Sequence, residues 1–300
     1  MDTDAIRTAI DDQIGAAKND ISALVRTLID QNTAPRSVVV DFRDVKREID
    51  GRTHAQFDRL VKLAGARNRN GHGHNILIVG PAGCGKTHCV AQVADALGLS
   101  FGFLSLSGGI SESHLIGRYA PTGENGRFEY RPAPFVEFYR NGGVFLLDEI
   151  DAADPNVLVV VNAALANGHL RLPDGTVVDR HADFVCVAAA NTFGTGADRQ
   201  YVGRNQLDAA TLDRFAACRL SFDYDTELER DAGRADVCEW AHGLRESVRK
   251  AQLRRIVSTR WILDASDLVD AGASTLDECK RSLLLDWTDS ELSACGVTQP

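Results

Sequence analysis

The apolar run Ile76-Leu77-Ile78-Val79 leads directly into Gly80-Pro81-Ala82-Gly83-Cys84-Gly85-Lys86-Thr87. This loop fits the pattern G-x-x-x-x-G-K-[ST], in which glycines let backbone N–H groups turn inward around phosphate oxygens. A helix that begins after such a loop points its positive end at the phosphates. Lys86 is then placed for the β- and γ-phosphates and Thr87 for a magnesium ion. We therefore predict a nucleotide-binding loop over these eight residues and the adjoining His88.

Further apolar runs follow, and we interpret them, like the first, as strands buried on both faces. They are Phe101–Leu106, Val144–Leu147 and Phe184–Ala189. Helical patterns at Thr87–Leu97 and Pro155–Ala166 lie between them, and another covers Thr53–Ala64. This alternation of strand and helix predicts an α/β fold with a parallel sheet.

Two carboxylates follow the strand Val144–Leu147. Asp148 can hold the magnesium ion through water, and Glu149 can orient and polarise an attacking water molecule. Asn191 ends the next strand and can hydrogen-bond that water or the γ-phosphate. We interpret Asp151 and Asp154 as the start of the following helix, with Asp154 as its N-cap.

Two arginines outside these strands are further candidates. Arg214 precedes the last strand run, and an outward-facing arginine there can reach a nucleotide bound by an adjacent subunit. The alternative is a salt bridge to Asp213. Arg260 opens a helix near the C-terminus and can fold back over the phosphates.

The charge is uneven along the 300 residues, which carry a net charge of −9. Residues 51–220 hold 16 basic and 16 acidic groups, whereas residues 1–50 are net −3 and residues 221–300 net −6. This balance argues against a broad nucleic-acid-binding surface. One basic cluster exists, and we interpret it as a solvated helix face: Arg245, Arg249, Lys250, Arg254 and Arg255.

The location of the protein is predicted from what the sequence lacks. No apolar run approaches the length of a membrane span, and no secretory signal follows Met1. Seven scattered cysteines without a Cys-x-x-Cys pair indicate reduced thiols. We expect a cytoplasmic protein without membrane contact, in the host cytoplasm if the source is viral.

We expect three regions in the chain. Residues 1–50 form an N-terminal helical extension, whose apolar stripe from Ile6 to Leu28 packs either in its own domain or on a neighbouring subunit. Residues 51–222 form the α/β core, with hairpins inserted near 117–135 and 168–182. Residues 223–300 form a small helical domain, with capping boxes at Thr275 and Thr288.

The order of these parts resembles the AAA+ ATPases over roughly residues 53–272. The segments Gly117–Phe135, Asn167–Val178 and Tyr201–Phe215 are similar to the helix-2-insert branch, which includes MoxR-like, CobS-like and McrB-like proteins. The resemblance implies a phosphate-loop sheet sandwiched by helices, a helical lid, and ATP with Mg²⁺ as ligands. It also implies roles for four residues, namely Asn191 as a sensor, Arg214 as the trans-acting finger, Arg260 as the second sensor and Arg204 as an additional interface arginine.

The same resemblance implies a homo-oligomeric ring, usually a hexamer. We favour an ATP-driven remodeller of a protein partner, as in MoxR-like or CobS-like proteins whose partners often carry a von Willebrand A-type domain. The alternative is an ATP- or GTP-driven motor subunit of a phage or restriction-type nucleic-acid machine. An inactive scaffold is disfavoured, because every catalytic position is filled. Hairpin residues would face the pore unless they pack on their own sheet: Tyr119, Phe128, Tyr130 and Leu172–Val177.

Overall fold

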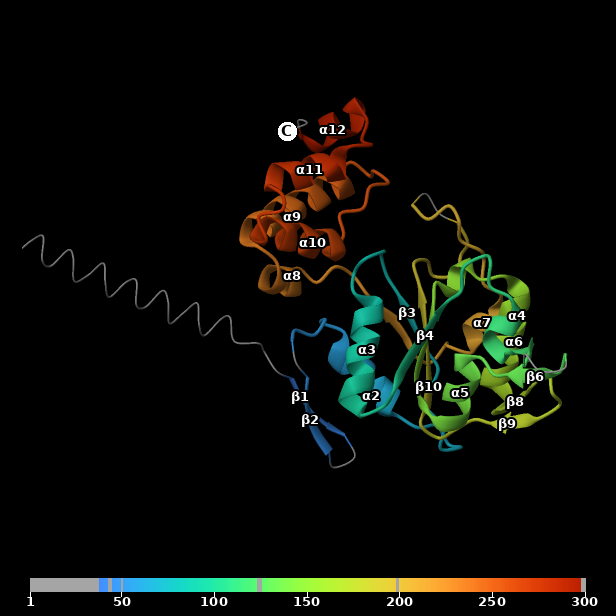
Figure 1. The fold of residues 1–300 in the computed structure, drawn as a ribbon. Helices are drawn as coiled ribbons and strands as arrows, with labels where there is room; N and C mark the ends of the chain where they lie inside the picture. The colour runs from blue at the N-terminus through green and yellow to red at the C-terminus, as the bar shows by residue number, and fades with distance from the viewer. Residues whose placement is uncertain (1–37, 43–44, 50, 123–125, 198–199, 298–300) are drawn as a thin grey trace, which may run out of the picture. The chain divides into compact units, whose positions relative to one another are not determined.

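A computed structural model describes residues 38–42, 45–49, 51–122, 126–197 and 200–297 (Figure 1). The predicted helix from Ile6 to Leu28 lies outside these residues. Residues 39–49 and 53–300 belong to one unit, which contains every element after β1. The elements are, in chain order, β1 (Val38–Phe42), β2 (Val45–Ile49), α2 (Phe57–Gly65), β3 (Ile76–Val79), α3 (Lys86–Leu97), β4 (Phe101–Ser105), α4 (Glu112–Ile116), β5 (Arg118–Pro121), β6 (Phe128–Arg131), α5 (Pro134–Asn141), β7 (Gly143–Asp148), the 3₁₀ turn η1 (Ile150–Ala152), α6 (Pro155–Asn167), β8 (His169–Arg171), β9 (Val177–Asp179), β10 (Phe184–Ala190), α7 (Ala209–Asp213), β11 (Arg219–Ser221), α8 (Thr226–Ala232), α9 (Ala235–Lys250), α10 (Thr259–Asp270), α11 (Leu276–Leu284) and α12 (Asp289–Cys295).

The central sheet has five strands in the order β11-β3-β10-β7-β4, and every neighbouring pair is parallel. In the register, Val187 of β10 lies opposite Ile76 of β3 and opposite Leu146 of β7. Every residue of β3 and β10 is buried, as continuous apolar runs in a parallel sheet should be. The predicted α/β fold is therefore confirmed.

Strand β4 differs from its prediction. It was expected to be buried on both faces, but it lies at the edge of the sheet, beside β7 alone. Its Phe103 is 60% exposed. A continuous apolar run does not reveal whether a strand has one neighbour or two, so periodicity alone could not separate β4 from β3.

Helices cover both faces of the sheet. Figure 1 shows α2 and α3 on one face and α5 and α6 on the other. On the second face, Phe135 of α5 packs edge-on against Phe145 and Phe184, with ring centroids 5.4 and 5.8 Å apart. Burying such a ring contributes roughly 1.5–3 kcal/mol. This packing attaches α5 to β7 and β10, the two strands that lead to the site residues.

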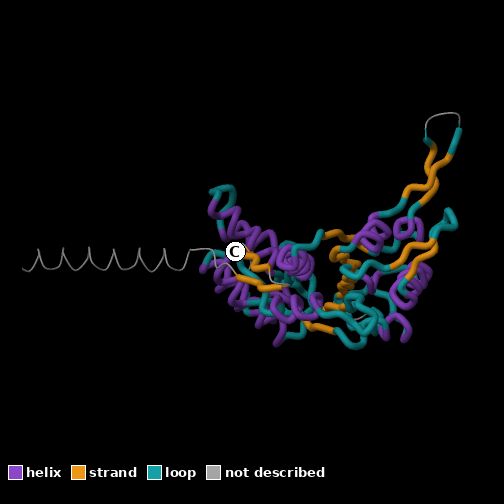
Figure 2. The backbone as a smooth tube through the Cα atoms, turned by 90° about the horizontal axis from the view of Figure 1, so that it is seen from below, coloured by secondary structure: helices purple, strands orange, loops and turns teal. Residues whose placement is uncertain are grey.

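Two hairpins leave the core at the ranges where the sequence predicts insertions. β5 pairs with β6 and β8 pairs with β9, both antiparallel. Figure 2 shows the two hairpins projecting on the same side of the molecule. Residues of both, including Tyr130 and Val177, line a common hollow.

The chain after β11 is helical and has an apolar core of its own. That core includes Ala241 of α9, Ile262 of α10 and Leu292 of α12. Thr275 and Thr288 form capping boxes with Glu278 and Glu291, as predicted. A small helical lid therefore follows the α/β part. The precise domain boundaries remain our proposal.

Candidate functional site

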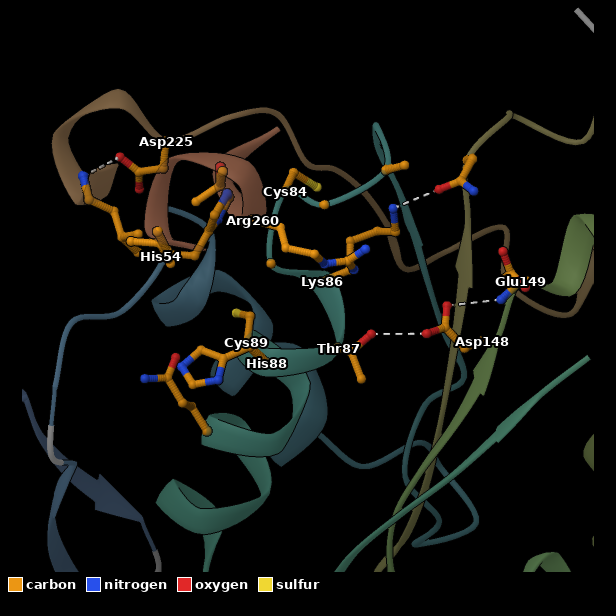
Figure 3. Close-up of a pocket in the computed structure, with 18 of the residues that line it drawn as sticks. His54, Cys84, Lys86, Thr87, His88, Cys89, Asp148, Glu149, Asp225 and Arg260 are labelled. Atoms are coloured by element: carbon orange, nitrogen blue, oxygen red, sulfur yellow. Dashed lines mark hydrogen bonds between the residues drawn. The ribbon is translucent and has the colours of Figure 1, made fainter. Parts of the chain in front are cut away.

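A cavity of about 620 Å³ opens at the carboxyl ends of the central strands. Figure 3 shows Lys86 and Thr87 facing Asp148 and Glu149 at one end, with His54, Asp225 and Arg260 at the other. The lining residues are His54, Ala82–Cys89, Gln92, Ser105, Asp148, Glu149, Asn191, Asp225, Leu228, Thr259, Arg260, Leu263 and Asp264. The predicted loop residues from Ala82 to His88 are thus all part of this wall.

The loop between β3 and α3 has the backbone that its glycines predict. Gly83 and Gly85 have φ angles of +71° and +90°, which residues with a side chain rarely adopt. A Cβ atom on Gly83 would also lie 2.7 Å from Cβ of Ser258, at the start of α10. Glycine at position 83 is therefore required by conformation and by the close approach of the lid.

Lys86 is held between the loop and the neighbouring strand. Its Nζ donates to the carbonyls of Gly80 and Pro81, at 2.7 and 2.9 Å, and to Oδ1 of Asn191 at 2.9 Å. Burial lowers the pKa of Lys86 below its ordinary value. Gly80 and Pro81 thus contribute through their carbonyls, and the sequence-predicted residues Lys86 and Asn191 are in direct contact.

Thr87 and Asp148 offer oxygen ligands for a divalent cation. Thr87 Oγ1 donates to Asp148 Oδ2 at 2.9 Å, so the two oxygens lie together at one point of the cavity. A hydroxyl and a carboxylate suit Mg²⁺, which usually completes its shell with water and substrate phosphates. Within the described ranges, no group of three or more His, Cys, Asp or Glu side chains is placed to hold a metal. The hydroxyl of Thr87 and the carboxylate of Asp148 would thus suit a Mg²⁺ ion that arrives with a nucleotide.

Glu149 follows Asp148 in an unusual conformation. Its φ of +55° is left-handed, which is uncommon for a residue with a side chain. Its Oε1 accepts from Nη2 of Arg204 at 2.8 Å, and its Oε2 accepts from Ser105 Oγ at 3.2 Å. The hydrogen bond from Arg204 holds the pKa of Glu149 below its ordinary value. The carboxylate is thus ionised at neutral pH and is engaged by its own chain.

Asp151 does not start a helix, contrary to the sequence interpretation. It lies in η1 and is fully buried. Its Oδ2 accepts from the backbone N–H groups of Asn191 and Thr192, at 3.1 and 2.9 Å, while Nη1 of Arg204 lies 3.5 Å from its Oδ1. Asp154, in contrast, caps α6 as predicted. Asp151 instead ties the end of β10 to the turn after β7, a role set by a partner forty residues away.

The two candidate arginines occupy different places. Arg260 lines the cavity, and its backbone N–H donates to the carbonyl of Gly83 at 3.3 Å. Arg214 follows α7 and is not among the lining residues. Its Nη1 lies 3.9 Å from Asp213 Oδ2, and about a third of its side chain is exposed. Arg214 therefore lies outside the cavity of its own chain.

The cysteines are free and buried, all seven of them. Burial raises the pKa of Cys84 in the phosphate loop, so this thiol stays protonated. A protonated, 3% exposed thiol is a poor nucleophile. Cys84 is better explained as a small residue that the loop accommodates than as a reactive group.

At the end of the cavity opposite Asp148, the sequence predicts Arg260 but not His54 or Asp225. The ring of His54 donates from Nε2 to the carbonyl of Asp223 at 3.0 Å, because its Nδ1 accepts from the N–H of Gln56. Asp225 accepts from the N–H of Ala55 at 2.8 Å. The two residues of each hydrogen-bonded pair are about 170 residues apart in the chain. No local sequence motif could therefore have indicated these contacts.

Comparisons with known proteins agree with this geometry. Residues 75–215 match the family model of the AAA domain (dynein-related subfamily). The chain is 26% identical over 226 residues to Protein CbbQ of Hydrogenophilus thermoluteolus, covering 71% of this chain and 81% of that protein. It is 27% identical over 238 residues to the denitrification regulatory protein NirQ of Stutzerimonas stutzeri, covering 75% and 83%. It is 31% identical over 168 residues to the aerobic cobaltochelatase subunit CobS of Sinorhizobium sp, covering 53% and 49%. The family match includes the phosphate loop, Asp148, Glu149, Asn191 and Arg214.

Proposed function

Because the chain carries an AAA+ ATPase domain of the MoxR-like type, we propose that it hydrolyses ATP with Mg²⁺ and uses the energy to remodel a protein partner. The observation that supports hydrolysis most directly is the placement of Glu149. Its carboxylate lines the same cavity as the phosphate loop and follows immediately after Asp148. A binding-only switch has no need of this second acid.

In the proposed reaction, the loop amides and Lys86 bind the phosphates of ATP. Thr87 and Asp148 would hold Mg²⁺, which neutralises charge on the phosphates when bound. Glu149 orients water for attack, and Asn191 holds Lys86 in place through the 2.9 Å hydrogen bond. Asp151 fixes the backbone at Asn191 by accepting a hydrogen bond from its N–H.

Glu149 must first be released from Arg204. The 2.8 Å ion pair lowers the basicity of the carboxylate, which makes Glu149 a weaker base toward water. We propose that the state described here is a resting state, in which Arg204 restrains the base. Arg204 would act at the subunit interface, as the family resemblance implies, only after it leaves Glu149.

The proposed assembly is a homo-oligomeric ring, most simply a hexamer. AAA+ proteins typically oligomerise, and Arg214 supports this because it lies outside its own cavity with its Nε buried and without a hydrogen-bond partner. A head-to-tail contact that brings Arg214 to the next subunit's nucleotide would close into a ring. Arg260, on the lid, would then report the nucleotide state to α10.

A protein partner is favoured over nucleic acid by the charges of the lid. Four of the five residues of the basic cluster pair with acids, because Arg245 pairs with Glu229, Arg255 with Glu291, and both Arg249 and Lys250 with Glu246. These ion pairs reduce the positive charge that the cluster offers to a phosphate backbone. One relative is by name a subunit of an aerobic cobaltochelatase, which also supports a protein partner. That this partner carries a von Willebrand A-type domain is part of the proposal and follows from the family resemblance alone.

The hairpins are the proposed contact surface for that partner. Phe128 and Val177 are 66% and 51% exposed, and Tyr119 is 49% exposed. Tyr130 instead donates its hydroxyl to the carbonyl of Ile116, and Leu172 is buried. The pore-facing role therefore remains proposed for Tyr119, Phe128 and Val177, while Tyr130 and Leu172 pack on their own domain.

The site of action proposed for this chain is the cytoplasm, of the host if the source is viral. Seven free, buried thiols support a reducing compartment. Across the described residues, no helix has both the length and the apolar character needed to span a membrane.

The proposed function is tested by ATP turnover of the purified chain with Mg²⁺, with and without duplex DNA. We expect turnover that requires Lys86, is lost in Lys86→Ala, and is unaffected by DNA. Stimulation by DNA with a steep dependence on salt would favour the alternative, a nucleic-acid motor. Absence of turnover in the ring-forming wild type would contradict hydrolysis itself.

A further inference from the structure

Two tyrosine hydroxyls hold one residue of the phosphate loop from both sides. The N–H of Ala82 donates to Tyr201 Oη at 2.9 Å, and Tyr224 Oη donates to the carbonyl of Ala82 at 3.0 Å. Tyr201 and Tyr224 come from segments on either side of α7 and β11. Neither tyrosine is part of the loop motif, yet both fix its backbone.

Each of these hydrogen bonds fixes a whole peptide plane. In a trans peptide the C=O and the following N–H point in opposite directions, and the described chain has no cis peptide. Tyr201 holds the peptide between Pro81 and Ala82, so the carbonyl of Pro81 points away from Tyr201, and this carbonyl accepts from Lys86 Nζ at 2.9 Å. Tyr224 holds the peptide between Ala82 and Gly83, so the N–H of Gly83 points away from Tyr224. Gly83 lines the nucleotide cavity, where an N–H donor is what a phosphate needs.

The position of Tyr224 is itself set by the lid. The guanidinium of Arg245, on α9, lies over the Tyr224 ring at 4.0 Å from its centroid. Arg245 donates to both carboxylate oxygens of Glu229, at 2.9 and 2.8 Å, and to the carbonyl of Val257. A guanidinium with three such bonds has little freedom, so the ring beneath it is held in one place.

Glu229 joins this arrangement to the other lid contact of the loop. It is fully buried on α8 and also accepts from the hydroxyl of Thr259. Thr259 directly precedes Arg260, whose N–H donates to the carbonyl of Gly83. The lid therefore reaches the peptides at both sides of Gly83, once through Arg245 and Tyr224 and once through Thr259 and Arg260.

We propose that Tyr224 is a positioning residue for nucleotide binding, and that Arg245 and Glu229 set its position from the lid. The hydroxyl of Tyr224 keeps the Gly83 N–H turned toward the phosphate site, so movement of the lid changes the affinity of the loop. This inference rests on the proposed function, because it concerns the same nucleotide cavity. Burial raises the pKa of Tyr224, so its phenol remains a donor throughout the physiological range.

The first test is Tyr224→Phe, which removes only the hydroxyl and leaves the ring under Arg245. We expect affinity for MgADP, measured by titration calorimetry, to fall about fivefold, the usual effect of one hydrogen bond. Tyr139→Phe is the matched control, since Tyr139 Oη donates to the carbonyl of Ala164 at 2.8 Å in the buried core, away from the cavity. We expect it to lower the melting temperature but leave MgADP affinity unchanged.

The second test is Arg245→Lys, which removes the planar, two-pronged contact with Glu229. We expect the same loss of MgADP affinity, and no further loss when it is combined with Tyr224→Phe. Arg255→Lys is the control, because Arg255 likewise pairs with a carboxylate, Glu291, and lies over the Trp287 ring, at 5.4 Å. It belongs to the lid but does not contact the Tyr224 ring.

The outcomes separate this inference from the proposed function. If the wild type does not bind MgADP, both are overturned. If the wild type binds MgADP and Tyr224→Phe binds it equally well, or no worse than Tyr139→Phe, the positioning role alone is wrong. If Tyr224→Phe weakens binding but Arg245→Lys acts independently of it, Tyr224 positions the loop without the lid, and the lid part of the proposal is overturned.

Discussion

At the end of the cavity formed by β3, β7 and β10, charged and polar side chains contact one another directly, whereas at the lid end the contacts pass through backbone groups. Lys86 reaches Asn191, and Thr87 reaches Asp148, each at 2.9 Å. At the lid end, Tyr224 and Arg260 donate to the backbone carbonyls of Ala82 and Gly83. The strand end supplies the side chains that take part in the reaction. The lid end positions the backbone of the phosphate loop.

Because of this difference, the strand end and the lid end of the cavity have different roles in a reaction cycle. The strand ends are fixed by a buried parallel sheet, so the positions of Asp148 and Asn191 change little when the lid moves. The loop, in contrast, contacts the lid at two successive residues. We therefore expect changes at the strand ends to affect the chemical step and changes in the lid to affect nucleotide affinity.

The largest expected effect comes from Arg214, which the account places in the next subunit's site. Arg214→Ala should lower ATP turnover by about 10³-fold, as expected for an arginine finger, while leaving ATP binding intact. Subunits with Arg214→Ala, mixed with subunits carrying Lys86→Ala, should recover part of the turnover, because one interface then has both residues. Steady-state phosphate release from the mixed rings measures this.

The control for mixing is a chain that carries both changes, which should restore nothing when mixed with Arg214→Ala. If hetero-rings form but the mixture of single variants stays inactive, Arg214 does not act across the interface. Catalysis at the strand end would then not require a residue from the adjacent subunit.

A smaller effect is expected at the lid end, from Glu229. Burial alone would raise the pKa of Glu229, but hydrogen bonds from Arg245 and Thr259 outweigh it and hold the pKa below the ordinary 4.5. The ionised form therefore stabilises the fold above pH 4.5, and this contribution is lost as the pH falls through the folded-state pKa. Glu229→Gln should cost about 3 kcal/mol of stability at pH 7, since it leaves Arg245 unpaired.

Calorimetric unfolding at several pH values checks this prediction. The difference in the free energy of unfolding between wild type and Glu229→Gln should become smaller as the pH falls below 4.5. Glu246→Gln serves as the control, because Glu246 pairs on the same lid with the exposed Arg249 and Lys250. If this difference in unfolding free energy does not change with pH, the charge of Glu229 is not what stabilises the lid.

The sheet and the phosphate end could be predicted because their signals are local. A continuous apolar run indicates a buried strand, and strand order brings the residues after β3, β7 and β10 to one edge. The edge position of β4 could not be predicted, because a continuous apolar run does not reveal whether a strand has one neighbour or two. The role of Asp151 could not be predicted, because its partners Asn191 and Thr192 follow β10, forty residues further along the chain.

Apart from Arg260, the lid end could not be predicted, for the same physical reason. His54 meets Asp223, and Tyr224 meets Ala82, across 169 and 142 residues of chain. A buried Glu229 with an arginine partner looks, in sequence, like any charged helix residue. Only the folded chain shows that it is fully buried.

The most direct test of the central claim is a paired measurement of ATP affinity and ATP turnover in Glu149→Gln. Glutamine keeps the shape of the side chain but cannot act as a base. We predict that Glu149→Gln binds ATP about as tightly as the wild type, while steady-state turnover falls by at least about 100-fold. Unchanged turnover in Glu149→Gln would contradict the assignment of Glu149 as the residue that activates water.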